Sequence, residues 1–228
     1  VTLNAYGILL WVIADTLDSV DGQLARMTNH KSKIGRILDG FGGNLMFVSI
    51  YLHLFARMVN TFPDVAWPLL LLTVLAGGIS HSLQSSLADY YRNAYLKFVI
   101  DASKAELDDA REVRVEYDAI SFMNNPVKKF LMRVYLNYTV QQELLSKNFQ
   151  MLRQRIATEF GDHVPDWFTD EYRRMNLPLM KYYAVLTTNT RMIIMAICVL
   201  MDQVPWYFVG EVVGINLVMV LVTIHQEK

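Results

Sequence analysis

Cysteine occurs once in the 228 residues, as Cys198. A single thiol excludes an intramolecular disulfide framework and the cysteine-rich zinc modules. The chain also lacks an excess of either charge, because 21 Lys and Arg oppose 22 Asp and Glu, which gives a formal net charge of −1. Without a basic field, nucleic acid is not expected as a partner.

Charged residues are missing from two long stretches of the chain. Residues 40–56 and 65–88 contain no Asp, Glu, Lys or Arg, whereas 27 of the 43 charged side chains lie between Arg92 and Lys181. A helix needs about 20 mostly apolar residues to cross the hydrocarbon core of a membrane. The sequence therefore predicts an integral membrane protein.

The apolar stretches predict an all-α, polytopic membrane helical bundle, because lipid offers backbone polar groups no partner outside a helix. Turn residues at Pro63 and at Pro205 predict two antiparallel hairpins. The five expected membrane helices cover roughly residues 1–24, 36–61, 66–91, 182–203 and 205–225. The expected domains are membrane helices over 1–91, a helical insert over 92–181 and a membrane hairpin over 182–228.

The insert is expected to hold an exposed helix over 94–117 and a basic amphipathic helix over 127–160. Both helices would lie on the bilayer surface, or else form a solvated hairpin or an oligomer contact. Basic residues gather in the loop near residues 26–36 and at the start of the insert. By the positive-inside rule the loop, the insert and the C-terminus face the cytoplasm.

Acidic residues recur within the first two predicted helices. Asp15, Asp18 and Asp21 are spaced by three, which places them along one helix face, and Asp39 follows in the next helix. An ionised Asp at mid-membrane costs about 2.5 to 3.5 kcal/mol, so a compensating cation is expected. Carboxylate oxygens suit Mg or Mn. The alternative is that these acids cap helices or pair with nearby Lys and Arg residues.

Small and basic residues accompany the acids. Gly22 and Ala25 keep the helix face low enough for a bulky phosphate to approach, and Arg26 offers a planar fork to a phosphate oxygen. Together these residues are typical of a site for a metal ion and a diphosphate.

The same residues resemble the motif of the CDP-alcohol phosphotransferases, D-x2-D-G-x2-A-R-x8-G-x3-D-x3-D. Seven of its eight fixed positions match over 26 residues. The matching residues are Asp18, Asp21, Gly22, Ala25, Arg26, Gly35 and Asp39. The family has six membrane helices, so a further helix is expected before Val1.

The resemblance implies an enzyme of phospholipid synthesis that moves a phospho-alcohol group, expected to be phosphatidyl, from a CDP-alcohol to an acceptor alcohol and releases CMP. CDP-diacylglycerol is the expected donor. Two Mg or Mn ions would be held by Asp18, Asp21 and Asp39, with Asp39 also catalytic. The residues expected at the nucleotide and its diphosphate are Asp18, Gly22, Ala25, Arg26 and Gly35.

The eighth position of the motif departs from the family. Its last aspartate, the usual general base, is replaced here by Gly43, with Asn44 beside it. Three alternatives follow from this replacement: another residue acts as the general base, or the acceptor is already ionised, or the protein has lost transferase activity. Asp15, one turn before Asp18, is the candidate that restores a carboxylate to the site.

Arg191 stands within the fourth apolar segment, where a charge should face the bundle interior or a wet cavity. Relatives that use a phosphorylated acceptor bind its phosphate with basic residues of later helices, which implies an acceptor-binding role for Arg191 and, more weakly, for Arg92 and Lys181. The alternative is that Arg191 pairs with Glu211 or Asp89. Gly210 and Gly214 have the spacing of a homodimer contact.

Three other functions compete with transfer. An inactive homologue would bind nucleotide or metal and act as a regulator. A cation transporter would need acids through the whole membrane depth, yet the later segments hold only Asp89, Asp202 and Glu211. A purely structural membrane protein is the third alternative.

Overall fold

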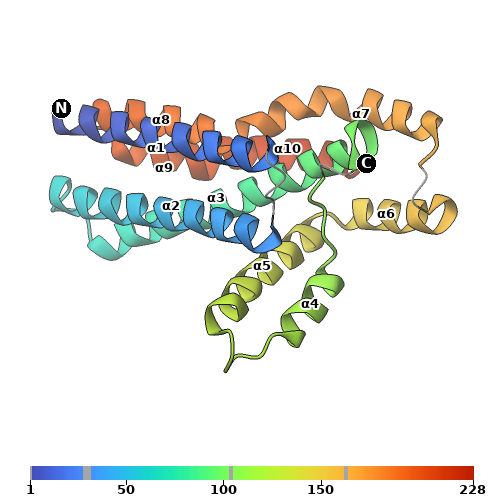
Figure 1. The fold of residues 1–228 in the computed structure, drawn as a ribbon. Coiled ribbons are helices and arrows are strands. Elements are labelled where there is room, and N and C mark those ends of the chain that lie inside the picture. The colour runs from blue at the N-terminus through green and yellow to red at the C-terminus, as the bar shows by residue number, and fades with distance from the viewer. Residues whose placement is uncertain (1, 28–31, 103–104, 162–163) are drawn as a thin grey trace. The chain divides into compact units, whose positions relative to one another are not determined.

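The computed structural model describes residues 2–27, 32–102, 105–161 and 164–228, and for Thr2, Asp21, Ala25 and Arg26 it describes the backbone alone. The described residues form helices and no strand, which confirms the predicted all-α class (Figure 1). The helices are α1 (Thr2–Met27), α2 (Lys33–Thr61), α3 (Trp67–Tyr95), the π-helix η1 (Leu96–Ile100), α4 (Ala110–Ala119), α5 (Pro126–Leu145), α6 (Lys147–Phe160), α7 (Asp166–Val185), α8 (Thr188–Leu200), α9 (Val204–Val209), the π-helix η3 (Gly210–Ile215) and α10 (Asn216–Gln226).

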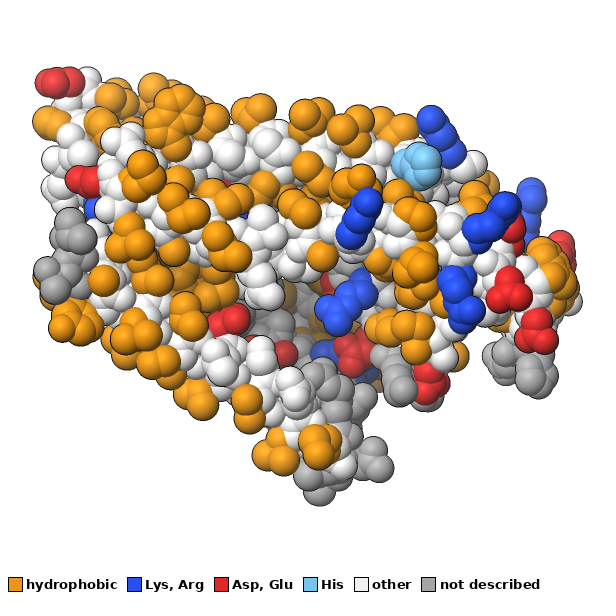
Figure 2. Space-filling view, turned by 90° about the horizontal axis from the view of Figure 1, so that it is seen from above, with side chains coloured by type: hydrophobic (Ala, Val, Ile, Leu, Met, Phe, Trp, Pro, Cys, Tyr) orange, Lys and Arg blue, Asp and Glu red, His pale blue; other side chains and the backbone are white. Residues whose placement is uncertain are grey.

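Five helical stretches are long and apolar enough to cross a membrane, which confirms the predicted number. They are Leu3–Leu24, Lys33–Thr61, Trp67–Ile100, Asp166–Leu200 and Val204–Gln226. Large hydrophobic side chains such as Leu17, Leu45 and Leu72 are more than half exposed on these helices. Figure 2 shows hydrophobic side chains spread over one face of the molecule. Exposure on this scale suits contact with lipid rather than water.

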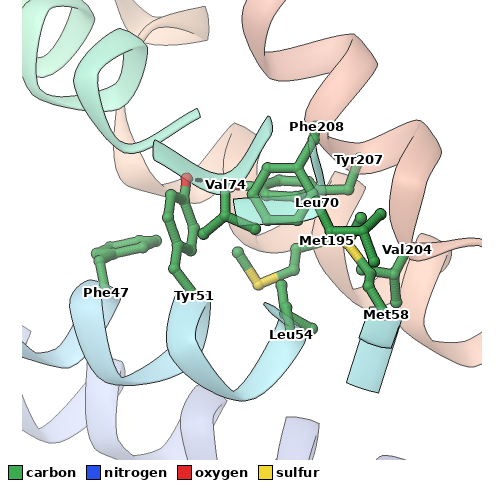
Figure 3. Packing of buried hydrophobic residues seen from close by; sticks show 10 residues of the cluster. All are labelled: Phe47, Tyr51, Leu54, Met58, Leu70, Val74, Met195, Val204, Tyr207 and Phe208. Carbon is green, nitrogen blue, oxygen red and sulfur yellow. Dashed lines mark hydrogen bonds between the residues drawn. The ribbon is translucent and has the colours of Figure 1, made fainter. Parts of the chain in front are cut away.

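The chain divides into two compact units, residues 1–74 with 192–208 and residues 75–191 with 209–228. The first unit is built on the buried face of α2, where Phe47, Tyr51, Leu54 and Met58 recur at helical spacing. They pack against residues of α3, α8 and α9, among them Tyr207 (Figure 3). The hydroxyls of Tyr51 and Tyr207 lie 2.7 Å apart. In lipid, close packing and such hydrogen bonds hold helices together.

Aromatic rings form the centre of the second unit. Phe98 of η1 meets Tyr172 of α7 edge-on, with ring centroids 5.3 Å apart, and Tyr91 of α3 stacks on Tyr183 of α7 at the same distance. Glu227, after α10, accepts a hydrogen bond from Tyr91 (2.5 Å) and another from the backbone N–H of Asn148 at the start of α6. These contacts join α3, α6, α7 and the C-terminal segment into one body.

The prediction of a continuous helix over 94–117 is wrong. η1 ends at Ile100 and α4 begins at Ala110, so the chain between them is not continuously helical. Polar side chains there bond to the backbone instead. Asp109 accepts from the N–H of Arg111 at 2.8 Å, and Asn93 accepts from the N–H of Glu106 at 2.9 Å. Such bonds compete with the helical pattern.

The predicted helix over 127–160 is broken in two. α5 ends at Leu145, and the hydroxyl of Ser146 donates back to the carbonyl of Gln142 at 2.6 Å. α6 then starts at Lys147. The fourth candidate span begins at Asp166 instead of near residue 182, because α7 continues through Pro178. The division of the chain into membrane segments and a cytoplasmic insert stays a prediction.

Candidate functional site

The first half of the motif lies on α1, which stays helical through Met27. Asp15 is half-buried and Asp18 is exposed. The side chains of Asp21, Ala25 and Arg26 lie outside what the structure describes, although their backbone belongs to the helix. Asp18 and Gly22 are four residues apart and therefore share a face of α1.

The second half of the motif opens α2. Ser32 caps this helix, because its hydroxyl accepts a hydrogen bond from the N–H of Gly35 at 3.0 Å. A Cβ at Gly35 would lie 2.9 Å from that hydroxyl, closer than such atoms normally approach. The absence of a side chain at Gly35 therefore serves the cap as well as any ligand. Asp39 follows one turn later and is exposed.

Two contacts set the register of α1 against α2 within the first unit. Arg57 of α2 donates to the side-chain oxygen of Asn4 on α1 (Nη1···Oδ1 3.3 Å). Further along, the rings of Trp11 and Phe47 meet edge-on with centroids 6.0 Å apart. Residue numbers rise along α1 as they fall along α2, so the two helices are antiparallel.

Counting along both helices from the contact of Trp11 with Phe47 places Asp18 and Asp39 at about the same height along the helix axes, that is, level with each other. An α-helix rises 1.5 Å per residue. Asp18 stands seven residues after Trp11, and Gly40 stands seven residues before Phe47. Seven residues are about two turns, so Asp18 lies on the face of α1 that carries Trp11. Asp39, beside Gly40, lies level with Asp18.

The same register brings Asp15 level with Gly43. Both positions are four residues from the ring contact, Asp15 after Trp11 and Gly43 before Phe47. Nothing lies within 4 Å of the place where a Cβ at Gly43 would stand. The space beside Gly43 is therefore open. The carboxylate at the same height along the helix axes is that of Asp15, on the facing helix α1.

The donor chemistry of the described residues fits a divalent ion. Asp18 and Asp39 supply hard carboxylate oxygens at one level of two neighbouring helices, the ligand type that Mg and Mn prefer. Among the described side chains, no three His, Cys, Asp or Glu lie close enough together to hold a metal ion. The third predicted ligand, Asp21, is outside that set. The metal assignment stays a prediction.

A comparison with known families bears on the motif. The family model of CDP-alcohol phosphatidyltransferase matches residues 3–139, more than half of the chain. The chain belongs to this family. No curated protein and no solved structure matches the chain. Membership in the CDP-alcohol phosphatidyltransferases supports a transferase of phospholipid synthesis in a membrane.

Arg191, the predicted acceptor ligand, lies in the second unit and is fully buried. Its guanidinium donates to Glu211 (Nε···Oε1 3.0 Å), to Gln84 (Nη2···Oε1 2.5 Å) and to the carbonyl of Leu186 (2.6 Å). The pairing with Glu211, one of the two alternatives read from the sequence, is confirmed. A role toward an acceptor would require these bonds to be exchanged, and it stays a prediction.

The sequence analysis did not predict the buried polar network around Arg191. Gln84 also donates to Asn216 (2.8 Å), and Asn216 donates to Ser80 at 2.8 Å. Ser80 and Gln84 lie one turn apart within the uncharged stretch 65–88. Their spacing could have indicated the network from the sequence, because polar residues on one face of an apolar helix form hydrogen bonds between helices in lipid.

Proposed function

We propose that this family member transfers a phosphatidyl group from CDP-diacylglycerol to an acceptor alcohol and releases CMP. The observation that carries the proposal is the register of α1 and α2. All eight motif positions, seven of which match the family, lie on these two antiparallel helices, with Asp18 level with Asp39. Carboxylates at one level of two neighbouring helices support a shared diphosphate site.

The proposed ligands of two Mg or Mn ions are Asp18, Asp21 and Asp39. When bound, the ions neutralise the diphosphate and stabilise the attacking and leaving oxygens. Arg26 would donate to a phosphate oxygen, and Gly22, Ala25 and Gly35 would leave room for the nucleotide. These residues act by positioning and by neutralising charge, the main sources of rate in phosphoryl transfer.

In the proposed reaction the acceptor hydroxyl attacks the β-phosphorus of the donor. The bond between that phosphorus and the bridging oxygen breaks, and CMP leaves with the oxygen. The hydroxyl proton must pass to a base that Gly43 cannot provide. The register supports Asp15 as this base, since it lies level with Gly43 on the facing helix. Asp39, one turn from Gly43, remains the second carboxylate of the site.

The test is CMP release from labelled CDP-diacylglycerol by membranes that carry the full chain, with a panel of alcohols and with or without Mg or Mn. We expect release that requires a divalent ion. Asp18→Asn should reduce it by about 100-fold or more, since an electrostatic contact to the reacting group is worth that much. Asp64→Asn, an exposed carboxylate in the α2–α3 turn, is the matched control and should behave as wild type. Metal-independent release, or full activity of Asp18→Asn, would overturn the mechanism.

An inactive family member is the alternative function, and Gly43 is the residue that favours it. Such a protein would bind a cytidine nucleotide with Mg or Mn but release no CMP with any acceptor. Binding of labelled CDP to the purified chain, measured beside the release assay, separates the two functions.

A further inference from the structure

A cavity of about 430 Å3 lies in the second unit, between the end of α3, η1 and the end of α7. Its wall is apolar and aromatic, with Tyr95 and Ile100 on one side and Met180 and Ala184 on the other. The volume is within the range of about 300 to 1,000 Å3 that is usual for small-molecule sites. The cavity is partly open to its surroundings.

Arg92 is the charged residue in this wall, and no Asp or Glu lines the cavity. Its side chain is exposed. Within the described part of the chain, Arg92 makes no ion pair or side-chain hydrogen bond, in contrast to Arg191, whose guanidinium is fully engaged. The N–H donors of the planar Arg92 guanidinium are therefore available to bind a ligand.

The walls of the cavity are held in place without a ligand. Tyr183, 2% exposed, stacks on Tyr91 with centroids 5.3 Å apart. Earlier along α7, Arg173 donates to the carbonyl of Val99 in η1 at 3.3 Å. The hydroxyl of Thr187, in the wall, is taken by the carbonyl of Ala184 at 2.6 Å. The space is thus preformed, and Arg92 provides its free donors.

We propose that this cavity binds an anionic phospholipid, with the phosphate on Arg92 and an acyl chain along the apolar wall. Arg92 lies in the last turn of α3, eight residues before the end of the candidate span Trp67–Ile100. Long basic side chains near the end of a span reach the headgroup level of a bilayer. Guanidinium binds phosphate through two parallel hydrogen bonds, and the wall carries no negative charge to oppose it. A zwitterionic lipid would bring its own cation to Arg92 and bind less well.

Native mass spectrometry of the purified full chain in detergent tests this site. The probes are dioleoyl phosphatidic acid, dioleoyl phosphatidylcholine and soluble glycerol 3-phosphate. Wild type should retain phosphatidic acid in preference to phosphatidylcholine. Arg92→Gln should lower that retention by about tenfold, the worth of a charged hydrogen bond. Arg111→Gln, the same change at an exposed arginine of α4 that does not line the cavity, should leave it unchanged.

A second variant tests the apolar wall. Ala184→Phe places a ring in the cavity from an exposed position and should lower retention of phosphatidic acid while Arg92 is intact. The proposal is overturned if Arg92→Gln retains the lipid as wild type does, or if Arg111→Gln loses it equally. Competition by glycerol 3-phosphate at equal concentration would mean a free-phosphate site and would also overturn it. Lipid retention is independent of CMP release, so this proposal and the transferase proposal fail separately.

Discussion

Gly43 is the residue on which the proposed mechanism depends most. It occupies the motif position of the family's last aspartate, and its surroundings are open. The register of α1 and α2 brings Asp15 to its level. A base supplied by the facing helix would allow a chain with Gly43 to carry out the transfer proposed for it.

A rescue experiment tests the role of Asp15. Asp15→Asn should lower CMP release by about 100-fold or more, the usual contribution of a general base. Adding Gly43→Asp should restore part of that loss, because a Cβ at this position would meet no atom within 4 Å. Gly42→Asp, an equally open position on another face of α2, is the control and should rescue nothing. Unchanged activity of Asp15→Asn would show that another group takes the proton.

Among the helices, α8 and η3 are joined by a buried ion pair. Arg191 and Glu211 are both almost fully buried, and their side chains lie 3.0 Å apart. Removing one member of such a pair leaves an uncompensated charge and costs about 3 to 5 kcal/mol, whereas replacing both with apolar residues is often neutral. This difference separates a structural role of Arg191 from an acceptor-binding role.

Arg191→Leu alone should therefore lower the thermal stability of the purified protein by several degrees or prevent its accumulation. Arg191→Leu with Glu211→Leu should recover most of the stability. The acceptor KM for CMP release by the stable double variant then decides the role of Arg191. If the role of Arg191 is structural, we expect this KM to be near that of wild type. A stable double variant with a strongly raised acceptor KM would favour the acceptor-binding role instead.

For the whole molecule, the predicted topology rests on the distribution of basic residues. The loop before α2 is basic and the insert holds 14 Lys and Arg beside 13 Asp and Glu, while the turns after α2 and α8 are nearly free of Lys and Arg. Arg57, near the end of α2, is paired with Asp202 at 2.7 Å. The cytoplasmic side should therefore carry the insert, and the α2–α3 turn should face away from it.

Labelling of single cysteines measures this topology. In a Cys198→Ser background, Ser121→Cys reports on the exposed loop of the insert and Asp64→Cys on the α2–α3 turn. A membrane-impermeant maleimide added to sealed right-side-out vesicles should label position 64 and spare position 121. Inside-out vesicles should reverse the pattern, and labelling of both positions from one side would contradict the topology.

The number and kind of the membrane helices could be predicted from the sequence, because hydropathy and charge are local properties of a segment. The helix boundaries within the insert could not be predicted in this way. The breaks at Ser146 and before Asp109 depend on single side chains that bond to the backbone. The predicted acids lie on α1 and α2 as expected, but their assignment to metal ions remains a prediction.

By itself the sequence determined the helical membrane class and the motif, because both follow from composition and from spacing along one helix. Only the tertiary structure decided that Arg191 pairs with Glu211 and that Asp15 lies level with Gly43. These relations join positions far apart in the chain. They depend on which helices pack together and in what register, and no local pattern contains that information.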